Sequence, residues 1–190
     1  MASPSNTIAY ASWILLLMVW LPAYFTSKKG ARTPVRGLQI ATTGLLALSF
    51  FLLFSGNKPF LLNMRIVSPP AWLAQFGAAL SVAAVLFAIW SRITLGSNWS
   101  GAFATLKHDH ELVRSGPYAR IRHPIYTGLW LAMFGTALTI GTLASYLAVV
   151  LASVAFLLRI RIEEALLTSQ FPEIYPEYKR RTCALIPFFW

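Results

Sequence analysis

Long uncharged blocks alternate along this chain with short segments that hold nearly all of its charge. Residues 8–26, 37–57 and 66–91 contain no Asp, Glu, Lys or Arg. A helix that crosses a bilayer needs about 20 predominantly apolar residues. Each of these three blocks meets that requirement, so the pattern predicts three membrane-spanning helices. No Lys or Arg precedes the first block, which argues against a secretory signal there.

A fourth uncharged block, residues 124–158, is too long for a single crossing. As one helix it would extend about 52 Å, whereas the hydrocarbon core is about 30 Å thick. Gly141 lies in a stretch, residues 139–145, that predicts a turn. We therefore expect a tight hairpin of two helices. Either its second helix extends through residues 159–163, or the hairpin crosses only part of the bilayer. The predicted fold class is an all-α integral membrane protein with about five transmembrane helices.

Polar chemistry is confined to the second half of the chain. All six acidic residues and all three histidines follow residue 107. They occupy a connector, residues 92–123, and a tail, residues 159–190. We interpret residues 1–91 as a membrane scaffold of three helices. Residues 92–190 then comprise the connector, the hairpin and a C-terminal segment, which we interpret as the working part, all within one structural domain.

The net charge of +10 follows the predicted topology. Of the 16 Lys and Arg residues, Lys58 and Arg65 lie between the second and third helices, and the others fall on the opposite side. Cytoplasmic loops carry such an excess of basic residues, so we expect the end with the polar connector and tail to be cytoplasmic, at the inner membrane if the chain is bacterial. Anionic headgroups account for the excess charge, and we expect no nucleic-acid partner.

One candidate site is the stretch "SGPYARIRHPIYTG", residues 115–128. Proline is well placed at the first position of a helix, so Pro124 predicts a helix start directly after His123. The free N–H groups of such a start can bind a carboxylate, and Tyr126 falls in its first turn. The alternative is an ordinary membrane flank, in which Arg120 and Arg122 only set topology.

A second candidate site lies where the hairpin ends. Arg159 and Glu163 are four residues apart and share a helix face. An ionisable residue at the edge of the membrane is a functional candidate, although an interfacial ion pair is the alternative. His108 and His110 are two residues apart in "HDHELV", with no third histidine nearby in the sequence. We therefore expect no metal site and interpret that segment as a solvated loop.

Four segments together resemble a known family. They are "LGSNWS" (95–100), "HELVRSGPYARIRHPIYTG" (110–128), "RIRIEEALL" (159–167) and "YPEYKRR" (175–181). In this order they resemble the isoprenylcysteine carboxyl methyltransferase family in a short, prokaryote-like form. Membrane methyltransferases of phospholipid amines and some sterol reductases share a segment similar to residues 116–126.

The resemblance implies S-adenosyl-L-methionine as the methyl donor, bound in a cytoplasmic pocket closed by the connector and the C-terminal segment, which makes the cytoplasmic side the catalytic one. The implied cofactor contacts are His110, Glu111, Leu112 and Val113 on the adenosine side, together with Tyr118, His123, Pro124, Ile125, Tyr126 and Glu163. Arg159 matches the arginine assigned to the acceptor's carboxylate and is the candidate catalytic residue. The expected reaction is carboxyl O-methylation of a lipid-like or prenylated acceptor that reaches the site from the bilayer.

Two other functions remain open at the level of sequence. A phospholipid amine N-methyltransferase would need a base to deprotonate its acceptor, and Glu164 or His123 could serve. A non-catalytic membrane scaffold or lipid-binding protein would have no affinity for the cofactor. A carboxylate acceptor needs no base, because it is already ionised at neutral pH.

Overall fold

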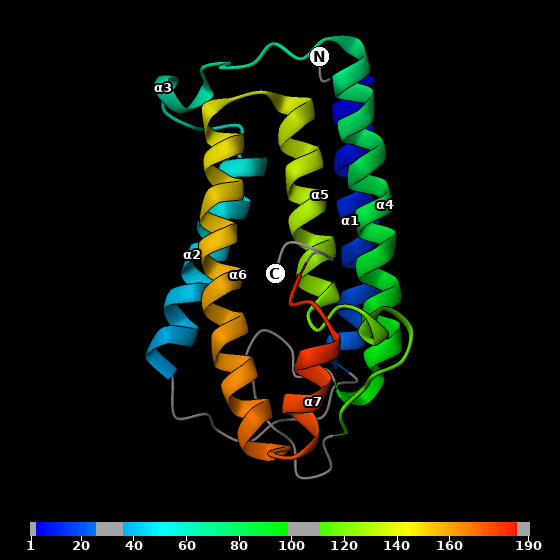
Figure 1. Ribbon diagram of the computed structural model, residues 1–190. Coiled ribbons are helices and arrows are strands. Elements are labelled where there is room, and N and C mark those ends of the chain that lie inside the picture. Colours follow the sequence, from blue (N-terminus) through cyan, green and yellow to red (C-terminus); the bar gives the residue numbers. More distant parts are fainter. Residues whose placement is uncertain (1–2, 26–35, 99–110, 186–190) are drawn as a thin grey trace.

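The computed structural model describes residues 3–25, 36–98 and 111–185 of the chain. Figure 1 shows a bundle of long helices with short elements at its two ends. The elements are α1 (Pro4–Phe25), α2 (Arg36–Phe54), α3 (Phe60–Asn63), α4 (Ala71–Leu95), α5 (Pro124–Ile140), α6 (Leu143–Gln170) and α7 (Ile174–Arg181), with 3₁₀ turns at Gly96–Asn98 and Gly116–Ala119. The expected all-α class is confirmed.

Four of the helices, α1, α2, α4 and α6, are long and apolar enough to cross a membrane. α5 is also apolar but has 17 residues, which is about 25 Å of helix. α6 has 28 residues and ends at Gln170. The second helix of the hairpin therefore extends through residues 159–163, as in the first of the two alternatives, and continues well past Glu163. The first helix of the hairpin is short.

The turn of the hairpin lies at Gly141, as predicted. Gly141 adopts the left-handed conformation with φ of 72°, which glycine tolerates because it has no Cβ. Its carbonyl accepts hydrogen bonds from the N–H groups of Ile66 and Val67, at 3.0 and 3.1 Å. A Cβ added at Gly141 would lie 2.1 Å from the carbonyl oxygen of Val67. The loop between α2 and α4 thus packs directly against this turn.

Small residues bring α4 and α5 close together. A Cβ on Gly135 would lie 2.6 Å from the carbonyl oxygen of Gly77, and one on Gly128 would lie 2.8 Å from that of Ala84. Small residues at helix contacts are typical of membrane bundles, in which close backbone approach and van der Waals packing stabilise the pair. This packing holds the N-terminus of α5 beside the end of α4.

A buried set of polar side chains links three helices. The indole N–H of Trp13 on α1 donates to Thr136 Oγ1 on α5 at 2.9 Å. Ser81 Oγ on α4 lies 3.1 Å from Thr136 Oγ1 and 3.1 Å from Ser12 Oγ on α1. Interhelical hydrogen bonds of this kind contribute about 0.6 kcal/mol each on average. They fix the relative rotation of the three helices more than they add to stability.

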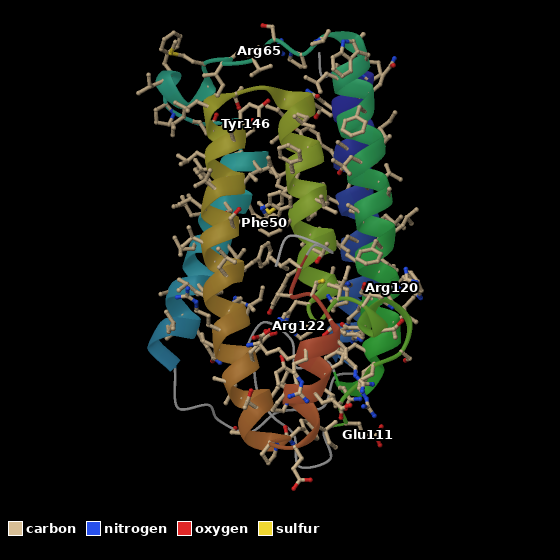
Figure 2. All side chains as sticks on the ribbon, in the orientation of Figure 1. Phe50, Arg65, Glu111, Arg120, Arg122 and Tyr146 are labelled. Atoms are coloured by element: carbon tan, nitrogen blue, oxygen red, sulfur yellow. The ribbon has the colours of Figure 1, made fainter. Side chains whose placement is uncertain are left out.

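Charged side chains gather at one end of the bundle. Figure 2 shows Arg65 at the end that carries α3 and the α5–α6 turn, with Glu111, Arg120 and Arg122 at the opposite end. The same separation was expected from the positions of the basic residues in the sequence. The candidate site residues on α5 and α6 belong to the second, more highly charged end.

Candidate functional site

Two segments far apart in the sequence pair just before α5. The N–H of Arg122 donates to the carbonyl of Cys183 at 2.8 Å. The N–H of His123 donates to the carbonyl of Ala184 at 3.1 Å. The hydroxyl of Thr127, one turn into α5, donates to the carbonyl of the neighbouring Leu185 at 2.7 Å. The C-terminal segment therefore holds the residues that lead into α5.

α5 starts where the sequence predicted. His123 is the residue before the helix and Pro124 is its first residue, where the missing N–H of proline costs no hydrogen bond. The ring of Tyr126 stacks on those of His123 and Phe156, with centroid separations of 5.8 and 5.0 Å. This stack fixes the direction in which the Tyr126 hydroxyl points.

Glu163 on α6 lies against the start of α5. The hydroxyl of Tyr126 donates to Glu163 Oε1. The second carboxylate oxygen, Oε2, lies 3.3 Å from His123 Nδ1. The Glu163 side chain is 25% exposed, so it is partly accessible as well as held. The two candidate stretches of the sequence thus meet at a single point.

Glu164, the next residue, has a different environment. Its Oε1 accepts from Arg122 Nε at 2.7 Å, and its Oε2 accepts from Lys179 Nζ on α7 at 2.5 Å. The side chains of Arg122 and Glu164 are only 8% and 12% exposed. A nearly buried ion pair is costly to break, because the remaining charge has no partner. Glu164 therefore ties the connector and α7 to α6.

His123 lies between the two carboxylates, with Nε2 3.5 Å from Glu164 Oε1. Burial of the ring opposes its protonation and lowers its pKa. The carboxylates of Glu163 and Glu164 act in the other direction and prevail, so the pKa of His123 is raised. The two carboxylates therefore favour the charged imidazolium more than water does for an exposed histidine.

α7 packs onto the connector through two buried tyrosines. The hydroxyl of Tyr178 donates to the carbonyl of Tyr118 at 2.6 Å, and burial raises the pKa of Tyr178 to about 12. The hydroxyl of Tyr175, whose residue is 1% exposed, has no hydrogen-bond partner among the described residues. Burial and the neighbouring Glu164 carboxylate raise the pKa of Tyr175 well above its usual range. Tyr175 thus offers a neutral donor beside the acidic pair, unpaired within the described part of the chain.

Arg159 lies one turn before Glu163 on α6. Its Nη2 donates to Thr43 Oγ1 on α2 at 2.7 Å. Arg159 also interacts with the Tyr126 hydroxyl, which donates to Glu163. The expectation that Arg159 and Glu163 face the same way is therefore confirmed.

The other predicted site residues lie at different distances from this cluster. Tyr118 is buried in the 3₁₀ turn of the connector, and Pro124 and Ile125 are buried in the first turn of α5. Glu111 lies farther out (Figure 2), where its N–H donates to Asn98 Oδ1 at 3.2 Å. Leu112 and Val113 follow it as half-buried residues. His110 lies outside the described residues, as do His108 and Asp109.

Sequence reasoning missed several members of the cluster. The sequence left Arg122 either beside a carboxylate-binding helix start or in a membrane flank, and it assigned no site role to Lys179 or Tyr175. Thr43 carries no signal in the sequence, because it is one hydroxyl residue in an apolar helix. The available signal for Arg122 is its position directly before His123 and the start of α5.

The sequence matches known proteins over half of its length or more. Residues 72–174 match the sequence model of the phospholipid methyltransferase family. The cobalt-zinc-cadmium resistance protein CzcN of Cupriavidus metallidurans is 37% identical over 102 residues, which cover 51% of this chain and 45% of that protein. The protein-S-isoprenylcysteine O-methyltransferase of Schizosaccharomyces pombe is 30% identical over 145 residues, which cover 71% of this chain and 61% of that protein. The chain thus spans about half the length of the curated relatives it matches.

The fold also matches a solved structure, that of the eukaryotic intramembrane Ras methyltransferase ICMT (isoprenylcysteine carboxyl methyltransferase). The TM-score is 0.57 at 20% identity, and the match covers 98% of each chain. The resemblance to isoprenylcysteine carboxyl methyltransferases seen in the motifs is confirmed. Because the family match covers more than half of the residues, including both segments that meet at Glu163, the chain is an integral membrane protein that belongs to the phospholipid methyltransferase family.

Proposed function

We propose that this protein is a membrane methyltransferase that uses S-adenosyl-L-methionine to methylate the carboxylate of a lipid-attached acceptor, such as a prenylated cysteine. The observation that carries the proposal is the contact of Tyr126 with Glu163, with Arg159 beside them. An accessible anion, a cation and a helix N-terminus converge there at one end of an apolar bundle. A polar cofactor and a lipid acceptor would have to meet at such a boundary.

The residues of the cluster fit the polar end of this cofactor. Glu163 would bind its ammonium group, while the N-terminus of α5 and the imidazolium of His123 would bind its carboxylate. The buried hydroxyl of Tyr175 has no partner in the described part of the chain. An unpaired buried hydroxyl costs about 1–3 kcal/mol, so a bound polar group would relieve that cost. When bound, the cofactor supplies an electrophilic methyl group on a sulfonium.

Arg159 would hold the acceptor in line with that methyl group. Its planar guanidinium can grip a carboxylate through two parallel hydrogen bonds. No base is needed, because the carboxylate is ionised at neutral pH. Transfer joins a cation and an anion into neutral products, so exclusion of water by the surrounding apolar helices would favour the transition state.

The orientation in the membrane follows from the charge distribution. We propose that the end with Arg120, Arg122 and α7 faces the cytoplasm, where the excess of basic residues is expected. Tyr118, Pro124 and Ile125 would line the cofactor side of the site with residues 110–113. The acceptor would enter from the bilayer.

N-methylation of a phospholipid amine is the second candidate function, and the description of the matched family favours it. That reaction needs a base to remove a proton from the ammonium. Glu164 is engaged by Arg122 and Lys179, and the carboxylates favour protonated His123. Glu163 is then the remaining acidic candidate, but it already accepts from Tyr126. The cluster therefore supports a carboxylate acceptor better than an amine.

A labelled-methyl assay tests the proposal. The purified protein in lipid nanodiscs would be incubated with methyl-labelled S-adenosyl-L-methionine and either N-acetyl-S-farnesylcysteine or phosphatidylethanolamine. Base-labile label on the farnesylcysteine is the expected result, because a methyl ester hydrolyses in base. Base-stable label on the phospholipid would support N-methylation instead. No label on either, with no cofactor binding by calorimetry, would support a non-catalytic scaffold.

A further inference from the structure

We propose that Thr43 on α2 is a positioning residue that aims the Arg159 guanidinium at the acceptor's carboxylate, so that α2 forms one wall of the acceptor site. This inference rests on the proposed function, because it assigns Arg159 to the acceptor. It adds to that function a helix from the N-terminal half. None of the sequence motifs includes α2.

The hydrogen bond between the two residues links neighbouring helices. Figure 1 shows α2 directly behind α6. Arg159 Nη2 donates to Thr43 Oγ1 at 2.7 Å. Both residues are partly buried, so the bond lies at the edge of the bundle and not in open water.

Thr43 is oriented to accept from this arginine. A hydroxyl has one proton and two lone pairs. The proton of Thr43 is donated to the carbonyl of Gln39, one turn earlier, at 2.7 Å. The lone pairs are therefore the part of the hydroxyl that remains for Arg159. Because its proton is held by Gln39, the Thr43 hydroxyl accepts from Arg159 and does so from a fixed direction.

Arg159 has more donors than this contact uses. A guanidinium carries five N–H donors in one plane, and Thr43 engages Nη2. The Tyr126 hydroxyl interacts with the same side chain from α5. A hydrogen bond at one edge of the guanidinium plane orients the whole group. Bidentate binding of a carboxylate requires such a fixed orientation. A long side chain without this anchor would sample many rotamers before each encounter with an acceptor.

The neighbouring Thr42 provides a matched control. Its hydroxyl also donates to the carbonyl of Gln39, at 3.1 Å. It is fully buried, and it lies about 100° around the helix from Thr43. Replacing either threonine by valine removes a hydroxyl of the same type and keeps the volume. Only the change at Thr43 removes the hydrogen bond from Arg159.

The test compares Thr43→Val, Thr43→Ser and Thr42→Val in lipid nanodiscs. The readouts are the KM for N-acetyl-S-farnesylcysteine, the Kd for S-adenosyl-L-methionine, and the ratio of affinities for the free acid and its methyl ester. Thr43→Val should raise the KM about tenfold and lower the acid-over-ester ratio, while the cofactor Kd stays at the wild-type value. Thr43→Ser restores the hydroxyl and should restore both values. Thr42→Val should match wild type.

The outcomes separate this inference from the proposed function. If wild type binds the acid better than the ester but transfers no methyl group, the proposed methyltransferase activity is wrong. The role of Thr43 then stands if Thr43→Val lowers the acid-over-ester affinity ratio, and it is wrong if the ratio is unchanged. If wild type forms the ester and Thr43→Val keeps the KM and the ratio of Thr42→Val, the role of Thr43 is wrong. A wild type with no preference for the acid would also overturn it.

Discussion

At the scale of single residues, two consecutive carboxylates on α6 have different environments. Glu163 is partly exposed and accepts from Tyr126. Glu164 is nearly buried and accepts from Arg122 and Lys179. Identical groups can therefore serve different purposes, binding in one case and assembly in the other. Substitution of each tests this difference.

Glu163→Gln should weaken binding of S-adenosyl-L-methionine by about tenfold or more, because a charged hydrogen bond contributes about 1.5–3 kcal/mol. Its effect on the melting temperature should be small. Glu164→Gln should have the reverse pattern, with a loss of about 3 kcal/mol of stability from the broken buried pair. Calorimetry and thermal unfolding of both variants measure the two effects. Equal loss of cofactor affinity in both would contradict the assignment.

Arg159→Ala should keep cofactor affinity and lose methyl transfer, because the proposed role of this side chain is toward the acceptor. Arg159→Lys keeps the charge but lacks the planar fork, so it should recover only part of the activity. The labelled-methyl assay and cofactor calorimetry give the two readouts. Loss of cofactor binding in Arg159→Ala, with transfer intact in Glu163→Gln, would reverse the roles of these two residues.

The raised pKa of His123 predicts that the stability of the folded protein depends on pH. Its pKa in the folded protein is raised above an unfolded value of about 6.5. Folding therefore favours the protonated ring, so its stabilisation is fully present below the unfolded pKa and is lost as the pH rises through the folded pKa. The groups that face the ring are Glu163 and Glu164 on α6 and Tyr126 on α5, with Arg122 alongside.

The melting temperature of wild type should therefore fall as the pH rises from 6 through the raised pKa of His123. His123→Asn, which cannot titrate, should show a shallower decline over the same range. Thermal unfolding in one detergent at several pH values makes the comparison. An unchanged slope in His123→Asn would assign the pH dependence to other groups.

At the scale of elements, the hairpin is defined by its turn. α5 is short and α6 is long, and Gly141 joins them where the loop after α2 packs closely. Because the carbonyl of Gly141 accepts from two residues of that loop, the turn connects the hairpin with the first half of the chain. The conformation of one glycine thus affects the position of α5.

Gly141→Ala should lower the melting temperature clearly, because alanine would be strained at φ of 72° and its Cβ would meet the carbonyl of Val67. Substitution at such a glycine costs more than about 1 kcal/mol. Gly44→Ala is the matched control, since a Cβ there meets nothing within 4 Å in the middle of α2. It should be neutral or stabilising, because alanine is the better helix former. Equal destabilisation by both would contradict this account of the turn.

At the scale of the whole molecule, charge is separated along the bundle. Arg65 marks one end, and Arg120 and Arg122 mark the other (Figure 2). The proposed cytoplasmic position of the second end predicts opposite accessibility for cysteines placed at Met64 and Glu173. Both residues are exposed.

In a Cys183→Ser background, Met64→Cys should react with a membrane-impermeant maleimide on intact cells. Glu173→Cys should react only after the cells are opened. Gel shifts of the labelled protein measure both. Labelling of Glu173→Cys on intact cells would show that the site faces outward.

The sequence divided the chain into a scaffold, residues 1–91, and a working part, residues 92–190. This division stays a prediction, and one contact crosses it: Arg159 in the second part binds Thr43 in the first. Hydropathy identifies α2 as a membrane helix but carries no information about which hydroxyl on it meets an arginine 116 residues away.

The sequence alone determined the long apolar helices, the hairpin turn at Gly141 and the two polar segments, because each follows from local composition and from chain geometry over a few residues. Motifs also brought His123, Tyr126, Arg159 and Glu163 forward as candidates. Only the tertiary structure decided that Glu163 meets Tyr126 while Glu164 binds Arg122 and Lys179. Such pairings depend on the rotation and spacing of packed helices, which side chains distant in the sequence set together.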